Sequence, residues 1–492
     1  MNKIGIIGAG VAGLSVAIRS AIKGEEVHVF EANAYPGGKL SEIKSGEYRF
    51  DAGPSLFTLP ELVDELFELA GENPRDHFEY SRMDPICKYF YESGLEITAH
   101  ADVEKFAGEI AQKTKVPFRQ IMKGMKKSQE LYETLAPLFM FKSIHKADTY
   151  RSKEALKAYP KIPRLNFLRT MHQENQQLYG NEEVIQLFDR YATYNGSDPY
   201  QTPATLNIIQ HLEHQLGAYA PKGGMIAITQ SLYELAKRKG VLFHFNRRVE
   251  EILLEGKKVI GLSTLEGGPF LCDAVVSNMD MVNTYRKLLP KAYAPKFLLN
   301  QPKSSSALIF YWGVKKQHPQ LGVHNILFSK NYREEFQQLF KGNSIFEDPT
   351  IYICITSKYE SEDAPKGCEN WFTMINVPNN QGQDWDQLAR EARTHMIQKI
   401  NRQLRTNIEE LIETEEILDP RSIEAKTSSF AGALYGNSSN NMFAAFLRHA
   451  NYSSNLQNLF FCGGSVHPGG GIPLSILSGK LAREFMDEKL PA

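Results

Sequence analysis

The hydrophobic pattern at the beginning of the chain predicts a strand, a helix and a second strand in direct succession. Residues 3–7 form a short apolar run, residues 11–23 are rich in Ala, Leu and Ile, and residues 26–30 form another short run. Short apolar runs are typical of buried strands, and the longer segment has the length of a helix. This order defines a βαβ unit with a right-handed crossover. The chain therefore opens with a nucleotide-binding half.

Further strand patterns along the chain predict two sheets. Residues 86–91 and 95–98 flank a Glu-Ser-Gly turn and predict a hairpin, whereas residues 100–215 are mostly helical in pattern. Strands are also predicted at 242–245, 274–277, 307–314, 350–355 and 371–377, and the end of the chain predicts a strand at 459–462, a glycine loop at 463–471 and a helix from Pro473 to about Glu488. Because no repeat or low-complexity linker separates these segments, we expect interleaved domains.

The composition is that of an ordinary folded protein and gives no sign of a nucleic-acid partner. The 492 residues are 42% hydrophobic and 23% charged, and 56 Lys and Arg against 57 Asp and Glu give a formal charge of -1. No uncharged apolar run reaches the ~18 residues needed to cross a bilayer, and the start lacks the apolar stretch of a secretory signal. Five scattered cysteines without a CxxC pair are expected to be reduced thiols. These features favour a cytoplasmic protein.

A glycine-rich motif lies between the first predicted strand and the first predicted helix. Gly8-Ala9-Gly10-Val11-Ala12-Gly13 is a GxGxxG sequence. Its first glycine permits the tight turn, the second lets a pyrophosphate approach the backbone, and the third permits close helix packing. The helix N-terminus then offers unpaired N–H groups to the phosphates. Glu31 closes the second strand, where a carboxylate can bind the ribose hydroxyls. We therefore predict a bound dinucleotide.

Glycines elsewhere in the chain favour FAD over NAD as that dinucleotide. Gly37-Gly38-Lys39 follows Glu31 and places a cation within reach of the phosphates or ribose. Gly463-Gly464-Ser465 follows a strand, and Gly469-Gly470-Gly471-Ile472-Pro473 opens the last helix, whose N-terminus can stabilise negative charge at the pyrimidine edge of a flavin. A second GxGxxG is absent from the sequence. The electrons are therefore expected to leave to oxygen, a quinone or another acceptor.

Several motifs together resemble one known family. The N-terminal block with Glu31 and Gly37-Gly38-Lys39 is followed by Phe50-Asp51-Ala52-Gly53-Pro54-Ser55, Asn195-Gly196-Ser197-Asp198-Pro199, Pro221-Lys222-Gly223-Gly224-Met225, Val276-Ser277-Asn278-Met279-Asp280 and Gly464-Ser465-Val466-His467-Pro468-Gly469-Gly470-Gly471-Ile472-Pro473. This set resembles the bacterial carotenoid desaturases related to phytoene desaturase, from one end of the chain to the other. The final motif is the most specific part.

The resemblance implies an FAD enzyme that inserts a double bond into a carotenoid by hydride transfer to flavin N5. It further implies cofactor contacts from Gly53, Pro54, Ser55 and Val249. Within this family, the sequence most resembles the branch that desaturates the 3,4-bond near an end group, as in γ-carotene or its 1-hydroxy derivative. Ile472 and His467 are expected at the flavin edge. For His467, a structural role in holding the glycine loop at 463–471 is an equally supported alternative.

The implied fold is α/β, a Rossmann-like FAD-binding domain interleaved with a substrate domain of mixed sheet and helices, as in amine oxidases. The expected division is 1–75, 221–283 and 455–492 for FAD, 76–130 and 284–454 for substrate, and 131–220 for a helical, membrane-facing region. One departure concerns catalysis. Relatives in the phytoene-desaturating branch carry an Arg-Asp pair where this chain has Lys142-Ser143, so no carboxylate base is available there. A weak group or water is expected to take the proton.

Two other residue groups have competing interpretations. His211 and His214 lie three residues apart on a predicted helix, but without a clear third ligand no metal site is predicted. The aromatic run Phe310-Tyr311-Trp312 either lines a tunnel for the polyene or packs in the core, and core packing is favoured.

The basic segment of residues 142–169 predicts peripheral contact with the cytoplasmic membrane. Its apolar neighbours include Leu138, Phe139, Tyr159 and Leu168. A basic segment with an apolar stripe suits an anionic lipid surface, whereas the alternative is a solvated helical face. The segment contains Lys or Arg at 142, 146, 151, 153, 157, 161, 164 and 169 against acids at 148 and 154.

The same residues are also compatible with other functions. The same cofactor site would suit a multi-step desaturase of phytoene or dehydrosqualene, a carotenoid isomerase that uses reduced flavin, or an amine oxidase. A carotenoid-binding flavoprotein without catalysis is the alternative from another class.

Overall fold

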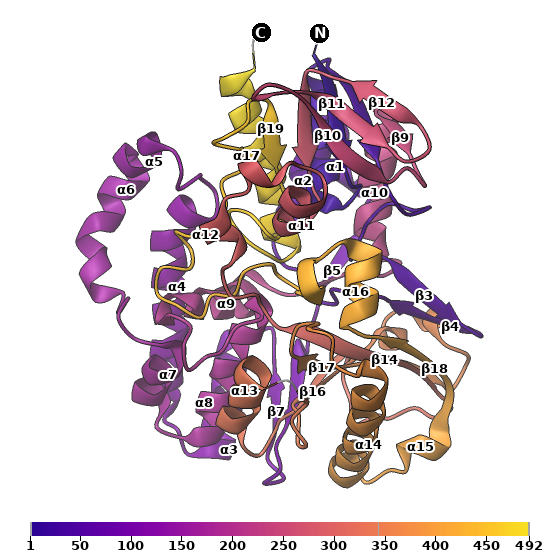
Figure 1. The fold of residues 1–492 in the computed structure, drawn as a ribbon. Coiled ribbons are helices and arrows are strands. Elements are labelled where there is room, and N and C mark those ends of the chain that lie inside the picture. Colours follow the sequence, from indigo (N-terminus) through magenta and orange to yellow (C-terminus); the bar gives the residue numbers. More distant parts are fainter. Residues whose placement is uncertain (1, 343, 491–492) are drawn as a thin grey trace.

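The computed structural model describes residues 2–342 and 344–490, without the side chains of residues 163 and 164. Two separate sheets organise the chain, one near the two termini and one at the opposite end of the molecule (Figure 1). A layer of helices lies along one side of both. This arrangement agrees with the expected α/β class with a mixed-sheet second half.

The sheet near the termini has five parallel strands in the order β19-β13-β1-β2-β9. Helices pack on one face around Leu14, Ile228 and Ile476, and a small antiparallel sheet packs on the other face around Val259 and Leu262. The strands are β1 Lys3–Ile7, β2 Glu26–Phe30, β9 Leu242–His244, β13 Ala274–Ser277 and β19 Leu459–Phe461; the helices are α1 Val11–Ile22, α2 Glu61–Leu69, α10 Ile226–Arg238 and α17 Ile472–Lys489; the small sheet is β10 Val249–Glu255, β11 Lys258–Thr264 and β12 Gly268–Leu271.

The second sheet has seven strands in the order β18-β14-β17-β16-β15-β6-β7. It is mixed, because β15 runs parallel to β6 whereas the other pairings are antiparallel. One face packs on the helix α14 Trp385–Leu404 through Phe310, Trp312 and Trp371. Phe310 and Trp312 are therefore core residues, as favoured from the sequence. The strands are β6 Cys87–Phe90, β7 Glu96–Ala99, β14 Ser306–Val314, β15 His324–Leu327, β16 Ile351–Ile355, β17 Glu369–Val377 and β18 Ile412–Leu418.

The helical layer comes mainly from residues 103–216. The short helices α5 and α6 project at the outer edge of the molecule, beyond α4 (Figure 1). The expected boundary between residues 130 and 131 falls inside α4, which continues as one helix from Phe118 to Phe139. The helices are α3 Val103–Thr114, α4 Phe118–Phe139, α5 Ala147–Arg151, α6 Lys153–Ala158, α7 Met171–Tyr179, α8 Glu182–Asp189 and α9 Ile208–His211.

The remaining elements connect the two halves. Two pairs of short strands, β3 with β4 and β5 with β8, lie outside the main sheets. They are β3 Glu42–Ser45, β4 Tyr48–Asp51, β5 Tyr80–Arg82 and β8 Tyr219–Pro221, and the further helices are α11 Met281–Lys287, α12 Lys296–Leu299, α13 Tyr332–Lys341, α15 Ile408–Leu411 and α16 Pro420–Thr427.

Among the strands that the pattern did not reveal, β10 and β18 carry several exposed glutamates, which obscure the strand signal. The last helix begins at Ile472, so Pro473 is its second residue and not its first. In the part of the chain that the structure describes, no helix is long and apolar enough to span a bilayer. The five cysteines are free thiols.

Candidate active site

A cavity of about 710 Å³ extends from the first sheet to the second and is lined by residues of both. Its first end lies at the carboxyl ends of β1 and β2, where Gly8 and Glu31 reach the wall. Its second end lies against the face of the seven-stranded sheet opposite α14, where Phe372 and Met374 line it. Ligands of open parallel sheets bind at the carboxyl ends of strands, so the position of the first end is that of a nucleotide site.

The GxGxxG motif shapes that first end. Gly8, Gly10, Val11 and Ala12 line the cavity. Gly13 instead packs behind the turn, because a Cβ there would lie 2.3 Å from the carbonyl oxygen of Gly8. No described side chain caps the N-terminus of α1, which begins after Gly10. Its free N–H groups and positive dipole end are therefore available to an anion in the cavity.

Glu31 lies where the sequence places it, at the end of β2, and is buried. One carboxylate oxygen accepts the backbone N–H of Ala9 at 2.8 Å, and the other accepts the backbone N–H of Asn33 at 2.9 Å. Among the described residues no cation pairs with it. A buried carboxylate that keeps unused lone pairs and lines a cavity can accept further hydrogen bonds from hydroxyls of a ligand.

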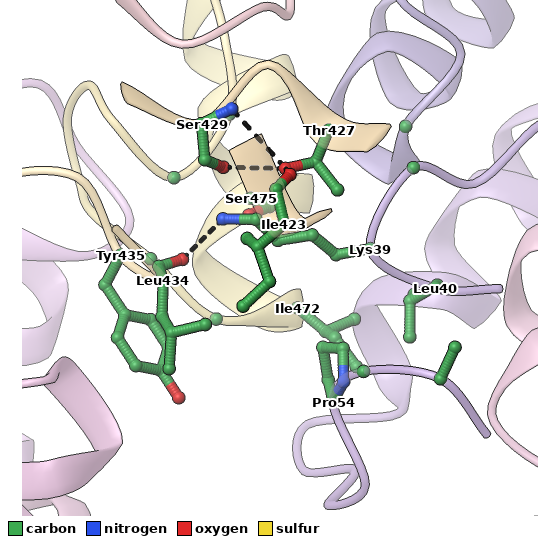
Figure 2. Close-up of a pocket in the computed structure, with 18 of the residues that line it drawn as sticks. Lys39, Leu40, Pro54, Ile423, Thr427, Ser429, Leu434, Tyr435, Ile472 and Ser475 are labelled. Atoms are coloured by element: carbon green, nitrogen blue, oxygen red, sulfur yellow. Dashed lines mark hydrogen bonds between the residues drawn. The ribbon is translucent and has the colours of Figure 1, made fainter. Parts of the chain in front are cut away.

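The Gly37-Gly38-Lys39 loop forms the neighbouring wall. Gly37 and Gly38 both have positive φ, and a Cβ on Gly37 would lie 2.3 Å from the carbonyl oxygen of Leu40. Nζ of Lys39 donates to the carbonyl of Leu434 at 2.6 Å (Figure 2). Burial lowers the pKa of Lys39 to about 8, against the opposing charge of Asp280. This lysine is thus a partly buried cation of the cavity wall and not a solvated loop residue.

The C-terminal glycine loop brings a second helix N-terminus to the same cavity. Gly463, Gly464, Ser465 and Gly471 line it together with Ile472, the first residue of α17. No described side chain caps this helix. Figure 2 shows Ile472 beside Pro54, on the same part of the wall. An uncapped N-terminus of an 18-residue helix favours negative charge at this point.

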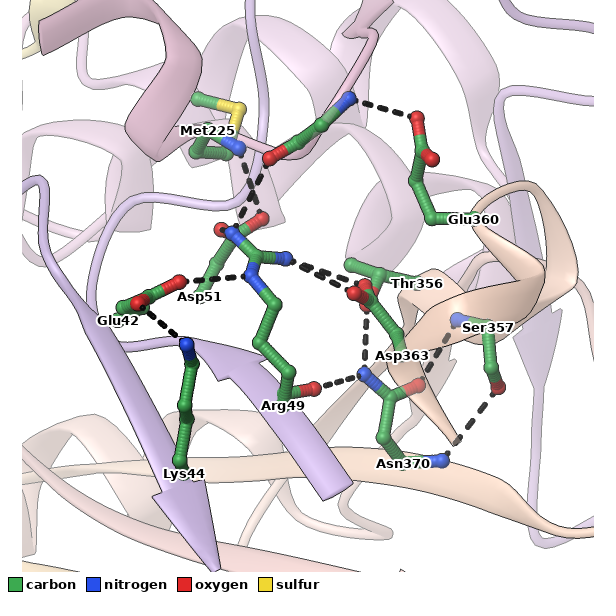
Figure 3. Close-up of polar contacts among 11 residues, drawn as sticks. Glu42, Lys44, Arg49, Asp51, Met225, Thr356, Ser357, Glu360, Asp363 and Asn370 are labelled. Carbon is green, nitrogen blue, oxygen red and sulfur yellow. Dashed lines mark hydrogen bonds and ion pairs between the residues drawn. The ribbon is translucent and has the colours of Figure 1, made fainter. Parts of the chain in front are cut away.

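Gly53, Pro54, Ser55 and Val249 also line the cavity. The segment before Gly53 is held by Arg49, which bonds to the carboxylates of Asp51 and Asp363, while Asp51 accepts the backbone N–H of Met225 at 2.9 Å (Figure 3). The network joins β4 to the start of α10 and to Asp363, which lies between β16 and β17 in the chain. It therefore fixes the loop that carries Gly53, Pro54 and Ser55.

His467 lies outside the cavity wall, so its expected place at the flavin edge is corrected. Its ring is buried, and Nε2 lies 3.0 Å from the carbonyl oxygen of Lys142. Burial lowers its pKa to about 4, which leaves the ring neutral. A neutral Nε2–H donating to that carbonyl ties the glycine loop to the residues after α4. This is the structural role that the sequence left open.

His214, one of the two spaced histidines, takes part in a hydrogen-bond network of the core. Nε2 of His214 lies 2.5 Å from the hydroxyl of Tyr191, deep in the core. The neighbouring Glu213 forms a 2.8 Å ion pair with Arg190. In the part of the chain that the structure describes, no group of three potential ligands is arranged to hold a metal.

The second end of the cavity contains residues that sequence reasoning missed. Its apolar wall consists of Ile309, Ile326, Phe336, Leu339, Phe372 and Met374. Polar residues interrupt this wall, and they include Arg190, Tyr194, Glu213, His324 and Tyr352. These residues come from separate helices and strands and share no local motif, so only the tertiary fold brings them together.

The donor set fits a flavin dinucleotide. Two uncapped helix N-termini face one cavity, one beside the glycine turn and Glu31, the other at Ile472. The first suits a pyrophosphate and a ribose, and the second suits an electron-rich ring that gains negative charge. An apolar chamber adjoins them. The fold and the site thus define the class of flavin-dependent oxidoreductases.

Comparison with known proteins identifies the family. A model of the flavin containing amine oxidoreductases matches residues 11–482, and the chain belongs to this family, with FAD as its cofactor. The chain is 51% identical over 486 residues to the 1-hydroxycarotenoid 3,4-desaturase of Flavobacterium sp. (strain P99-3), covering 99% of both chains. It is 31% identical over 493 residues to the 4,4'-diapolycopene oxygenase of Methylomonas sp, covering 98% of this chain and 97% of that one.

A solved structure shares the fold. Cyclohexylamine oxidase from Brevibacterium oxydans IH-35A matches with a TM-score of 0.63 at 13% identity, over 99% of both chains. The expected amine-oxidase-like architecture is therefore confirmed.

Proposed function

We propose that this protein is an FAD-dependent carotenoid desaturase that forms the 3,4 double bond near a 1-hydroxylated end group. The observation that carries the proposal is the continuity of one cavity, from the glycine turn of the dinucleotide motif to an apolar sheet face. The 51% identity to a 1-hydroxycarotenoid 3,4-desaturase along 99% of both chains supports the substrate class and the bond. When bound, FAD accepts the hydride that an allylic C–H group of a polyene can lose.

The residues of this chain supply binding, orientation and exclusion of water. Gly8, Gly10 and the N-terminus of α1 would hold the pyrophosphate, Glu31 would hold the ribose hydroxyls, and Lys39 would add positive charge. The N-terminus of α17 at Ile472 would stabilise negative charge on the cofactor. The apolar wall around Phe372 and Met374 would hold the extended polyene, so catalysis would depend on positioning.

The single proton that is lost after the hydride leaves without a strong base. Lys142 forms an ion pair with Glu154 at 2.5 Å, and Ser143 is buried, so the place that carries an acid in relatives offers none here. Glu213, a carboxylate in the cavity wall, is held by Arg190. Because loss of a hydride makes the neighbouring carbon very acidic, a weak group or water suffices.

We also propose that the helical arm formed by α5, α6 and residues 159–169 contacts a membrane surface, because a carotenoid dissolves in lipid. Leu156 is 62% exposed and Leu168 is 83% exposed. Phe443 is 66% exposed on the adjoining segment, where Phe446 packs against Phe139 of α4 with ring centroids 5.3 Å apart. A protein that binds lipid peripherally exposes such side chains beside cations.

The number of cations without an ion pair on this arm is smaller than the number of Lys and Arg residues in its sequence. Lys142 pairs with Glu154, Lys146 pairs with Glu488 at 2.6 Å, and Arg169 pairs with Glu174. The side chain of Arg164 lies outside the described residues. Four exposed cations, Arg151, Lys153, Lys157 and Lys161, make no ion pair with a described residue. Each contributes on the order of 1 kcal/mol when close to anionic lipid.

The electron acceptor is proposed to be oxygen or a quinone, since the chain has one GxGxxG motif and no second nucleotide module. A quinone shares the membrane with the carotenoid.

The test is a reaction of the purified holoenzyme with a 1-hydroxylated carotenoid and a quinone. The expected product is lighter by two hydrogens and absorbs at longer wavelength. A product of unchanged mass indicates an isomerase, and several new double bonds indicate a multi-step desaturase. Oxidation of amines with release of peroxide indicates an amine oxidase, and a flavin that is not bleached under anaerobic conditions indicates a carrier.

Met374→Trp provides a matched variant. Met374 lies on β17 and lines the apolar end of the cavity. The larger ring narrows the path of the polyene without touching the dinucleotide end. Activity should therefore fall while the flavin absorbance is kept. A variant that retains full activity would contradict the assignment of this wall to the polyene.

A further inference from the structure

Three polar side chains form a continuous hydrogen-bonded relay in the cavity wall. The hydroxyls of Ser55 and Tyr352 lie 2.6 Å apart, and the hydroxyl of Tyr352 lies 2.7 Å from Nδ1 of His324. All three residues line the cavity. His324 is at the start of β15 and Tyr352 is on the adjacent strand β16, whereas Ser55 comes from the loop after β4. The relay therefore joins the proposed flavin wall to the substrate sheet.

This relay keeps hydrogen-bonding capacity that the protein does not use. Ser55 and Tyr352 are both partly exposed, and they face the cavity that they line. Each hydroxyl has one donor and acceptor lone pairs, and only two bonds connect the three residues. Whichever way the protons point along the relay, the hydroxyl pair retains an acceptor or a donor for one more partner. An alcohol can serve either arrangement, whereas a hydrocarbon can serve neither.

His324 contributes to the relay through its bond to the hydroxyl of Tyr352. It is 4% exposed, and its Nε2 has no hydrogen-bond partner among the described residues. Burial lowers its pKa to about 4, so the ring is neutral. A buried nitrogen without a partner is costly for the fold, and an apolar residue would avoid that cost. The ring is a positioning residue that orients the hydroxyl of Tyr352.

The neighbouring ionic cluster differs from the relay because its groups satisfy one another. Arg190 bonds to Glu213 at 2.8 Å and to the hydroxyl of Tyr89 at 2.6 Å, and Tyr194 donates to Glu213. The guanidinium and carboxylate are both buried. The charges of this cluster therefore satisfy each other, whereas the hydroxyls of Ser55 and Tyr352 keep bonding capacity toward the cavity.

From this arrangement we infer that Ser55, Tyr352 and His324 form a subsite for a hydroxyl group at the end of the substrate, which selects hydroxylated carotenoids and sets the bond that is oxidised. The inference rests on the proposed function and deepens it. In a 1-hydroxy substrate, three bonds separate the oxygen from carbon 3, so the group that binds this oxygen must lie beside the flavin. Ser55 follows Gly53 and Pro54, which we assign to the flavin wall, and meets this condition. A few placed polar groups in an apolar pocket orient a ligand in this way.

The test compares two substrates on the holoenzyme, a 1-hydroxylated carotenoid and the counterpart in which hydrogen replaces only the hydroxyl. Wild type should prefer the alcohol in kcat/KM. Tyr352→Phe and Ser55→Ala should each reduce this preference by about tenfold or more, mainly by slowing the alcohol. His324→Phe should act in the same direction. A fold defect would lower both rates together and leave their ratio unchanged.

Equilibrium binding gives a readout that does not depend on turnover. With anaerobically reduced wild-type holoenzyme, the dissociation constant should be lower for the alcohol than for its counterpart without the hydroxyl. In Tyr352→Phe and Ser55→Ala this difference should become smaller. Tyr91→Phe is the matched control, because Tyr91 is a buried tyrosine whose hydroxyl donates to the carbonyl of Glu183 at 2.9 Å, away from the cavity. It should keep the wild-type ratio.

The outcomes separate this inference from the proposed function. If wild type desaturates neither carotenoid, the proposed function fails. If it desaturates both equally well, or if Tyr352→Phe and Ser55→Ala keep the preference for the alcohol, the desaturase stands and the hydroxyl subsite is overturned.

Discussion

Nζ of Lys39 donates a 2.6 Å hydrogen bond to the backbone carbonyl of Leu434, across 395 positions of the chain. The bond joins the glycine loop after β2 to a second segment that lines the same cavity. It also holds an ammonium group in a partly buried place, where charge is costly. The charge state of this lysine is therefore sensitive to pH and to the anion beside it.

We expect FAD affinity to fall as the pH rises above about 8. Burial lowers the pKa of Lys39 from 10.5 to about 8, so in the FAD-free protein the ammonium is charged below that pH and neutral above it. An anionic cofactor binds the charged form better. Affinity should decrease by up to about tenfold per pH unit, measured by fluorescence titration of the FAD-free protein.

Lys39→Met should bind FAD more weakly at neutral pH and lose this pH dependence, whereas Lys39→Arg keeps a charge and should bind with a flat profile. A wild-type affinity that is constant from about pH 7 to about pH 9.5 would show that the ammonium does not assist FAD binding.

Gly13→Ala should expel the cofactor. The new Cβ would lie 2.3 Å from the carbonyl oxygen of Gly8, so α1 must move away from the turn that holds the pyrophosphate. Overpacking of this kind costs about 1–3 kcal/mol of stability. The ratio of flavin to protein absorbance and the Tm should both decrease.

Gly108→Ala is the control for that variant. Gly108 lies inside α3, where a Cβ meets no atom within 4 Å. This change should keep the flavin and raise stability by roughly 0.5–1 kcal/mol. Full flavin occupancy in Gly13→Ala would refute the packing argument.

The protein should lose stability as the pH falls from about 6.5 towards about 4. Burial lowers the pKa of His214, His324, His449 and His467 to about 4, from the ordinary value of 6.5. In this window the unfolded chain binds protons that the folded protein does not, so stability increases with pH and is lost on acidification. Each ring contributes up to about 1.4 kcal/mol per pH unit.

Urea unfolding at several pH values measures this slope. His467→Gln should reduce the slope and leave the pH profile of kcat unchanged, because the ring lies outside the cavity and bonds to the carbonyl of Lys142. A shifted kcat profile would return His467 to the catalytic group.

Reversal of four cations should abolish membrane binding. Arg151, Lys153, Lys157 and Lys161 are exposed on the helical arm, and their replacement by Glu should eliminate co-sedimentation with vesicles that contain anionic lipid. Loss of about 1 kcal/mol per cation, followed by repulsion, is enough to release a peripheral protein.

The matched control reverses Lys257, Lys258, Lys315 and Lys316, which are exposed on other parts of the molecule. It changes the net charge equally and should still co-sediment. Equal binding of both variants would assign the contact to another surface.

The sequence predicted those parts of the site that carry a local signal. The GxGxxG turn, Glu31 and the last glycine loop are recognisable because backbone turns and helix starts depend on neighbouring residues. Tyr352 and His324 carry no such signal, since strand pairing brings them together and the packing of the loop after β4 brings Ser55 to them. For His467 the local motif was misleading. The motif predicted a place beside the flavin, but the side chain bonds to Lys142 after α4.

The order of strands in the first sheet also has a consequence for biosynthesis. β1 lies next to β13, and β13 lies next to β19, so residues from both ends of the chain complete one nucleotide site. Because β19 and α17 come after the other parts of the site in chain order, the cofactor pocket is incomplete until both have been synthesised. FAD can therefore be captured only after these two segments have joined the first sheet.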